Sequence, residues 1–190
     1  AEQLTRITAD DCRALFAQGR EVDELMELFA AAWRALGGRV VEQHRGRFAR
    51  MLESVEGSSA ALVRELLQMP FYRDVSRYDG RPVGFLKRAQ ITVSDLDAAR
   101  PGSFGALSEL TIFADNLVPH VLRIDGVLGF DPDLAARIDR GERLDWGTRE
   151  EVEIRACAVV AAEEVAARLA GRATPRQLDS WLWTRGGRPE

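Results

Sequence analysis

Asp115 is the residue whose surroundings in this sequence most favour chemistry. It stands in the middle of LTIFADNLVPHVL, residues 110–122, which is apolar almost all the way round when it is read at the helical period. A carboxylate in apolar surroundings is a candidate catalytic acid or base, because burial and neighbouring groups tune its pKa. One alternative is a solvated face, marked by a polar arc that Asp115 would share with Thr111, Asn116, His120 and Arg123.

Pro119 affects how the backbone near Asp115 can fold. Proline has no N–H, so the helical hydrogen bond to the carbonyl of residue 115 cannot form. We therefore expect a helix over residues 110–122 that kinks or loosens at Asp115.

Two further places combine charged or aromatic side chains with a helical pattern. Lys87 heads such a pattern together with Arg88, and a lone Lys-Arg pair is usually solvated surface. Near the C-terminus, Asp179 and Trp183 fall on one helical face, whereas Trp181 falls on nearly the opposite one. From the residues alone, we expect both tryptophans to pack in a core.

Cysteine and histidine positions argue against a metal centre. The two cysteines, Cys12 and Cys157, and the two histidines, His44 and His120, match no metal-ligand spacing. A glycine-rich phosphate motif is also absent. No cofactor is implied, because no metal constellation is visible. We expect Cys12 and Cys157 to be reduced, buried thiols in a cytoplasmic protein, and His44 to be a packed or surface histidine.

Composition sets the class of protein and of partner. A chain of 190 residues with 46% hydrophobic and 29% charged residues suits one globular domain. The net charge of −4 disfavours a nucleic-acid polymer as partner but does not exclude a single nucleotide. No apolar run is long enough to span a membrane, and the polar start AEQLTRITADD, which begins at Ala1 without a methionine, is not a signal peptide.

The first half of the chain predicts a series of helices and one turn. Thr8 and Asp11 predict a capping arrangement for a short helix that ends near Gly19. A second helix over residues 22–36 should end at Gly37 and Gly38. The remaining expectations are a helix whose inner side runs from Val40 through His44 to Val55, a helix from Ser58 that Pro70 stops, a turn at Asp79 and Gly80, and an extended piece over 81–85.

The second half continues the helical pattern. After Phe85 a helix is favoured, although β-branched residues at 91–93 leave a strand open. Asp131 and Pro132 start a short helix that ends near Gly141, and Thr148 with Glu151 predicts a capping box for a helix at the centre of the core. Glu151 and Arg155 can pair on that helix, and Thr174 with Gln177 caps the last one. The fold class is all-α, with room for one short β-hairpin.

Five stretches, taken together, resemble the queuosine salvage family, whose members hydrolyse queuosine 5′-phosphate to release the base queuine. They are YRDV at 72–75, FLKRAQI at 85–91, LTIFADNLVP at 110–119, GTREEVEIRAC at 147–157 and LDSWLW at 178–183. Their common order and compatible gaps, from about Asp10 to the C-terminus, argue against coincidence. The resemblance implies one helical domain over residues 1–190, similar to helix-hairpin-helix DNA glycosylases.

The resemblance also implies roles for single residues. The family's catalytic aspartate falls on Asp115, and its base-contacting aromatic falls on Phe113. Lys87 would hold the 5′-phosphate or pair with Asp115. Asp179 would accept the N–H donors of a guanine-like edge while an aromatic such as Trp183 stacks on the ring. Ser180 and Thr184 are weaker candidates for substrate contacts, and structural pairing is expected for Asp95 and Arg155.

Two departures from the family pattern bear on this inference. Family members usually carry a further N-terminal region that helps to close the base pocket, and nothing in these residues corresponds to it. Asn116, Leu117 and Thr184 stand where the family commonly has tyrosine, arginine and an acid. The sequence thus predicts a nucleotide hydrolase that supplies queuine for tRNA modification, with a non-catalytic partner module or a DNA-glycosylase-like enzyme as alternatives.

Overall fold

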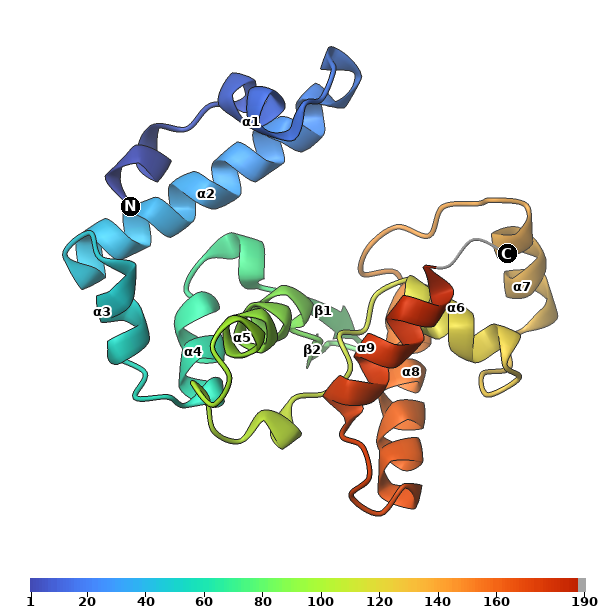
Figure 1. Ribbon diagram of the computed structural model, residues 1–190. Coiled ribbons are helices and arrows are strands. Elements are labelled where there is room, and N and C mark those ends of the chain that lie inside the picture. Colours follow the sequence, from blue (N-terminus) through green and yellow to red (C-terminus); the bar gives the residue numbers. More distant parts are fainter. Residues whose placement is uncertain (188–190) are drawn as a thin grey trace. The chain divides into compact units, whose positions relative to one another are not determined.

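The computed structural model describes residues 1–187 as a mainly helical protein with one short β-hairpin, which confirms the predicted fold class (Figure 1). Its contacts form two compact units, Ala1–Arg73 with Arg100–Gly105, and residues 74–99 with 106–187. These units describe only how the chain packs within each of them. The single domain expected from the sequence therefore stays a prediction.

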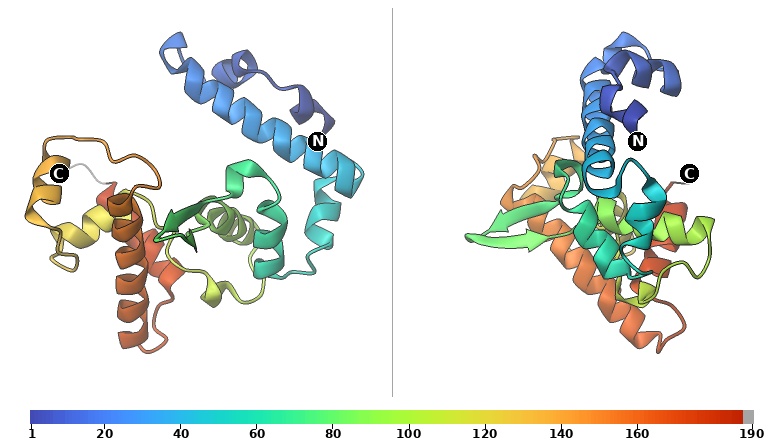
Figure 2. Two further views of the ribbon diagram at one scale, coloured as in Figure 1. Left: turned by 180° about the vertical axis from the view of Figure 1, so that it is seen from behind. Right: turned by 90° about the vertical axis from the view of Figure 1, so that its left-hand side faces the viewer.

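The first unit is built around one long helix. Helix α2, Asp23–His44, is flanked along its length by the 3-10 helix η1, Glu2–Arg6, and by α1, Ala9–Phe16 (Figure 1, Figure 2). Thr8 caps α1 as predicted, since its hydroxyl accepts from the Asp11 amide and the Asp11 carboxylate accepts from the Thr8 amide. The remaining elements of this unit are η2 (Arg20–Val22), α3 (Phe48–Glu53), α4 (Ser59–Leu66) and η3 (Pro70–Tyr72).

The predicted helix break at Gly37 and Gly38 is wrong, because α2 runs through both glycines to His44. Gly37 is buried, and a Cβ there would lie 2.8 Å from the Leu4 Cβ and 2.9 Å from the Ala1 carbonyl oxygen. The missing side chain at Gly37 therefore lets η1 approach the helix. A glycine inside a helix costs about 1 kcal/mol but does not end it when packing supports the helix.

His44, predicted to be either packed or at the surface, is packed within an ionic cluster of the first unit. Glu65 on α4 accepts hydrogen bonds from the Arg39 guanidinium, at 2.8 and 3.0 Å, and lies 2.9 Å from the His44 ring. The Arg39 guanidinium, chiefly, lowers the pKa of Glu65 to about 2. This cluster ties the end of α2 to α4.

The second unit begins with the predicted hairpin. Strands β1, Val75–Tyr78, and β2, Arg81–Gly84, are antiparallel, and Val75 pairs with Gly84. Asp79 and Gly80 at the turn have φ values of 47° and 76°, the left-handed geometry that two-residue hairpin turns require. The chain then enters helix α5, Lys87–Ala99, so the helical alternative after Phe85 is correct.

The predicted helix over residues 110–122 is wrong in its first half. Residues 110–114 have no helical structure, and α6 spans only Leu117–Ile124. Leu110, Ile112 and Ala114 are buried while the residues between them are less so, which is the period of an extended chain. An apolar run of this length is compatible with a helix or with an extended strand. Here the burial of every second residue shows that the chain is extended.

Pro119 does not kink a helix, because it lies in the first turn of α6. In that turn the backbone N–H groups have no helical acceptor, so the missing N–H of proline costs little. The Asp115 carboxylate accepts hydrogen bonds from two other amides of this turn, those of Leu117 and Val118.

The core of the second unit lies between α6, α8 (Arg149–Arg168) and α9 (Pro175–Gly186) (Figure 1). As predicted, α8 contributes to the core, through Val152, Ala158 and Ala162. Short elements complete the unit: η4 (Leu107–Glu109) and α7 (Pro132–Asp139), which Asp131 caps as predicted. None of the helices within residues 1–187 is long and apolar enough to cross a membrane.

Two local predictions on α8 are wrong. The Thr148 hydroxyl donates to the Asp145 carbonyl instead of forming a capping box, because the Glu151 carboxylate accepts from the Gly147 amide and from Arg155. Cys157 is exposed, whereas Cys12 is buried as expected, and both are free thiols. Position 157 lies on the face of α8 that turns away from the core residues Ala158 and Ala162.

The two adjacent glycines of α2 give a matched test of this packing. Gly38→Ala should raise the free energy of unfolding by about 1 kcal/mol, because nothing lies within 4 Å of its added Cβ and alanine favours the helix. Gly37→Ala should lower it, because the same methyl group meets the backbone of η1. Chemical denaturation of both variants measures the two changes, and a gain in stability for Gly37→Ala would contradict the close approach.

Candidate active site

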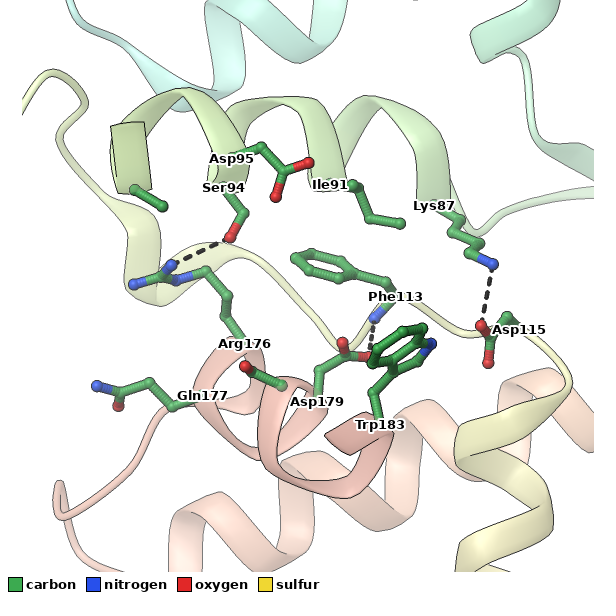
Figure 3. Close-up of a pocket in the computed structure, with 12 residues that line it drawn as sticks. Lys87, Ile91, Ser94, Asp95, Phe113, Asp115, Arg176, Gln177, Asp179 and Trp183 are labelled. Atoms are coloured by element: carbon green, nitrogen blue, oxygen red, sulfur yellow. Dashed lines mark hydrogen bonds and ion pairs between the residues drawn. The ribbon is translucent and has the colours of Figure 1, made fainter. Parts of the chain in front are cut away.

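A pocket of about 690 Å³ opens in the second unit between α5, the extended segment at residues 110–116 and α9 (Figure 3). Its lining combines two cations, three carboxylates and two aromatic rings. The lining residues are Lys87, Ile91, Ser94, Asp95, Ala98, Phe113, Asp115, Arg176, Gln177, Asp179, Ser180 and Trp183.

Asp115 lies at the point where the extended segment turns into α6. One carboxylate oxygen accepts from the backbone amides of Leu117 and Val118, at 2.9 and 3.2 Å, in the first turn of that helix. The other accepts from the Lys87 ammonium at 3.0 Å. The Asp115 side chain is only 10% exposed, so the solvated-face alternative is wrong for this residue. Helix amides and an ammonium together hold a negative charge inside the pocket.

Lys87 is the first residue of α5, and it is also the only lysine in the chain. All other residues in the lysine and arginine total of 26 are arginines. Its ammonium group has three N–H donors, of which one points to Asp115, and its side chain is 31% exposed. Within residues 1–187 the ammonium has no second acceptor, so its remaining donors can face a ligand.

Asp179 occupies a different environment, although it lines the same pocket. It is 5% exposed, and one carboxylate oxygen accepts from the backbone amide of Phe113 at 2.7 Å. Burial raises the pKa of Asp179 to about 6, with a further raising effect from the charge of Asp115. Two carboxylates in one pocket thus have unlike surroundings, which is the usual arrangement when two acids serve different functions.

Aromatic side chains form part of the pocket wall. Phe113 extends from the segment before Asp115, and Trp183 faces it from α9 (Figure 3). Trp183 is 55% exposed and Trp181, which does not line the pocket, is 62% exposed, so the predicted core packing of both tryptophans is wrong. Helix α9 buries a different stripe, at Pro175, Asp179 and Leu182.

Six of the seven predicted site residues line the pocket, and Thr184 is the exception. The Thr184 hydroxyl donates to the backbone carbonyl of Ser180, one turn earlier on α9, and its side chain is exposed. Ser180 itself lines the pocket. Thr184 follows Trp183 on α9, and one residue further along a helix points in a different direction, away from the pocket.

The far end of the pocket was not foreseen. There the Arg176 guanidinium donates to the Ser94 hydroxyl at 3.1 Å, next to Gln177 and Asp95 (Figure 3). Asp95 was expected to be structurally paired, but within residues 1–187 it has no ion-pair or hydrogen-bond partner. Helical spacing could have found this end, because positions 87, 91, 94 and 98 on α5 and 176, 180 and 183 on α9 each share one face.

Arg155 forms the expected structural pairs, although in a buried position. Its guanidinium donates to the carboxylates of Asp74 and Glu151 and to the Ala114 carbonyl oxygen, and only 8% of the side chain is exposed. Arg155 does not line the pocket, but it contacts the residue that precedes Asp115.

The raised pKa of Asp179 predicts a specific pH dependence of stability. A carboxyl group with a higher pKa in the folded than in the unfolded protein binds its proton more tightly when folded. Its stabilising contribution is therefore full below pH 3.8 and is lost as the pH rises through about 6. Relative to the wild type, Asp179→Asn should gain on the order of 2 kcal/mol between pH 4 and pH 8, because asparagine stays neutral.

Denaturant unfolding of both proteins at the two pH values measures this gain. Asp139→Asn is the control, since the Asp139 side chain is 63% exposed and lies outside the pocket lining. A stability difference between Asp179→Asn and the wild type that stays constant from pH 4 to pH 8 would show that burial does not raise this pKa.

Comparison with known proteins places this chain in a family. The family described as queuosine salvage protein matches residues 1–189. A protein of Sphaerobacter thermophilus named queuosine 5′-phosphate N-glycosylase/hydrolase is 40% identical over 196 residues, covering 99% of this chain and 60% of its own length. Proteins of the same name from Bos taurus and Mus musculus are 33% and 29% identical, with 84% and 96% of this chain and 48% and 57% of their own lengths covered. The chain thus spans roughly half to three fifths of the relatives it matches, and it belongs to the queuosine salvage protein family.

Proposed function

We propose that this chain hydrolyses the N-glycosidic bond of queuosine 5′-phosphate and releases queuine, which is then available for tRNA modification. The observation that carries the proposal is the Asp115 carboxylate, held by Lys87 and by the start of α6 inside a pocket with aromatic walls. The names of the relatives support the same reaction, and the proposal transfers it to the part of those proteins that this chain spans.

Breaking the glycosidic bond builds positive charge on the ribose. An ionised carboxylate close to the anomeric carbon stabilises that oxocarbenium character and orients the attacking water. Asp115 suits this role, because its charge is fixed in place by three hydrogen bonds and need not reorganise during the reaction. Water adds to the anomeric carbon and gives up one proton to the solvent, the bond to the ring nitrogen breaks, and that nitrogen takes up a proton from the solvent.

The chemistry of the leaving base makes stabilisation of the ribose more important. A 7-deazaguanine has no N7 to protonate, so the usual acid-assisted departure of purines is not open to it. Stabilisation of the developing charge on the ribose must then supply more of the rate enhancement. This requirement favours a rigidly held acid such as Asp115 over a mobile one.

Base recognition falls to the middle of the pocket. Asp179 can accept the paired N–H donors of a guanine-like edge with the carboxylate oxygen that Phe113 leaves free. Phe113 and Trp183 offer ring faces for stacking on the base. Ser180, one residue beyond Asp179, adds a hydroxyl to the same wall.

Lys87 can serve both the acid and the phosphate. One of its donors holds Asp115, and the partly exposed ammonium has further donors for a phosphate oxygen. The ribose, beside Asp115, and the 5′-phosphate would then both lie at the Lys87 end of the pocket. The base would extend toward Arg176 (Figure 3).

Asp115→Asn tests the proposed acid. The amide is nearly isosteric but carries no charge, so release of queuine from queuosine 5′-phosphate should fall by about 10³-fold or more. Chromatography of the free base measures the rate, and thermal unfolding should change little. Asp139→Asn, a surface aspartate with an ion pair to Arg123, should keep full activity.

Near-normal turnover in Asp115→Asn would remove this residue from the mechanism. Absence of queuine release from the wild-type chain would instead reject the hydrolase proposal, and tight binding of the substrate without release would favour a binding module.

The phosphate contact of Lys87 gives a separate prediction. The wild type should prefer queuosine 5′-phosphate to queuosine by about tenfold or more in kcat/KM, because a charge-assisted hydrogen bond to phosphate is lost with the nucleoside. Lys87→Met should abolish this preference, and Lys87→Arg should keep part of it because the positive charge remains. Equal kcat/KM values for the two substrates in the wild type would rule out the contact.

A further inference from the structure

We propose that Arg155 is a positioning residue for this site, which fixes the Lys87–Asp115 pair from outside the pocket. Its effect on catalysis rests on the proposed function, but its effect on the geometry of the pair does not. The buried Arg155 guanidinium donates in three directions, its three arms. One arm ends at the backbone carbonyl of the residue before Asp115, and another ends at the Asp74 carboxylate, which also accepts from the Lys87 backbone amide.

The first arm holds the segment that carries the acid. The Arg155 Nε donates to the Ala114 carbonyl oxygen at 3.0 Å, and Ala114 is the residue directly before Asp115. This segment is extended, so it has no helical hydrogen bonds of its own to hold it in place. An outside donor is therefore needed, since a buried carbonyl without a partner is costly.

The second arm holds the helix that carries the lysine. The Arg155 Nη2 donates to Asp74 Oδ2, and the same oxygen accepts from the backbone amide of Lys87 at 3.1 Å. Asp74 thus satisfies one of the amides at the start of α5. Burial alone would raise the pKa of Asp74, but its bonds to Arg155 and to the Lys87 amide lower it overall.

The backbone at this junction is strained, and this strain requires support. Leu86, directly before Lys87, has a φ of 54°, which a leucine rarely adopts. The Asp74 carbonyl oxygen accepts from the amides of Phe85 and Leu86, at 2.9 and 3.3 Å, and so fixes this turn. Asp74 therefore anchors the entry to α5 by both its side chain and its backbone.

The third arm points away from the pair. The Arg155 Nη1 donates to Glu151 at 3.0 Å, one turn earlier on α8, and the guanidinium carbon lies 4.0 Å from the centre of the Phe85 ring. Only a planar guanidinium can donate in three directions while it stacks on an aromatic ring, so a lysine could not replace Arg155. Glu151 provides a natural control, because it shares the guanidinium but touches neither Ala114 nor Lys87.

Asp74→Asn and Glu151→Gln are matched variants that test the arm toward Lys87 and the arm that points away from it. Each replaces one carboxylate partner of Arg155 by an amide of the same shape. With queuosine 5′-phosphate, Asp74→Asn should lower kcat about tenfold or more, because a displacement near 1 Å can cost about 100-fold in rate. KM should change less than kcat, since Phe113, Asp179 and Trp183 still bind the base. Glu151→Gln should keep kcat within about twofold of the wild type at a comparable loss of Tm.

The single lysine provides a second readout that does not depend on activity. An amine-reactive acylating reagent can label only the α-amino group and Lys87, so the first serves as internal reference for the second. Release of Lys87 from Asp115 in Asp74→Asn should raise its relative labelling rate about threefold or more, because the ammonium is no longer held within 3.0 Å of the carboxylate. The rate should be unchanged in Glu151→Gln.

The outcomes separate this inference from the proposed function. If kcat and labelling in Asp74→Asn match those in Glu151→Gln at similar Tm, Arg155 is only structural and the inference is overturned. If the wild type releases no queuine but labelling of Lys87 still rises in Asp74→Asn alone, the positioning holds and the hydrolase proposal fails. If Asp74→Asn does not fold, Arg155→Lys replaces it in the same two assays. The labelling rate of Lys87 should then rise in Arg155→Lys, and an unchanged rate would overturn the inference.

Discussion

The site depends on one constraint: a carboxylate must keep its charge while most of its surface is removed from water. Asp115 meets it through two backbone amides at the start of α6 and through the ammonium of Lys87. Burying an ion without such partners costs several kcal/mol, so the partners must be in place before substrate arrives. The start of α6, the entry to α5 and the extended segment between η4 and α6 bring these groups together.

The pocket applies the same physics in two opposite ways. Asp115 is surrounded by donors, whereas Asp179 has one neutral amide and a nearby negative charge, and burial brings its pKa to about 6. Under the proposed function, the first environment stabilises positive charge that builds on the ribose. The second leaves one carboxylate oxygen of Asp179 for the base. Arg155 and Asp74 contribute from behind, because they hold the backbone on both sides of the charged pair.

Local signals in the sequence predicted local structure well. Thr8, Ser58, Asp131 and Thr174 cap helices where expected, and Asp79 with Gly80 forms the hairpin turn, because each depends on hydrogen bonds or backbone angles within a few residues. Predictions failed where distant contacts decide. Gly37 does not end α2, since η1 packs on it. The missing capping box at Thr148 has a local cause, since Glu151 is engaged by Gly147 and Arg155, each four residues away.

By itself, the sequence determined the helical class, most helix starts and the family, and the family likeness indicated Asp115, Lys87, Phe113, Asp179 and Trp183 as neighbours of one ligand. Only the tertiary structure decided that residues 110–114 are extended, that Thr184 faces away, and that Ser94, Asp95 and Arg176 form the other end of the pocket. It also decided the partners of the charges, since Lys87 meets an acid 28 positions later and Arg155 meets one 81 positions earlier. Burial and charge pairing act through space, and a linear pattern of residue types records them only where the partners lie within a turn of each other.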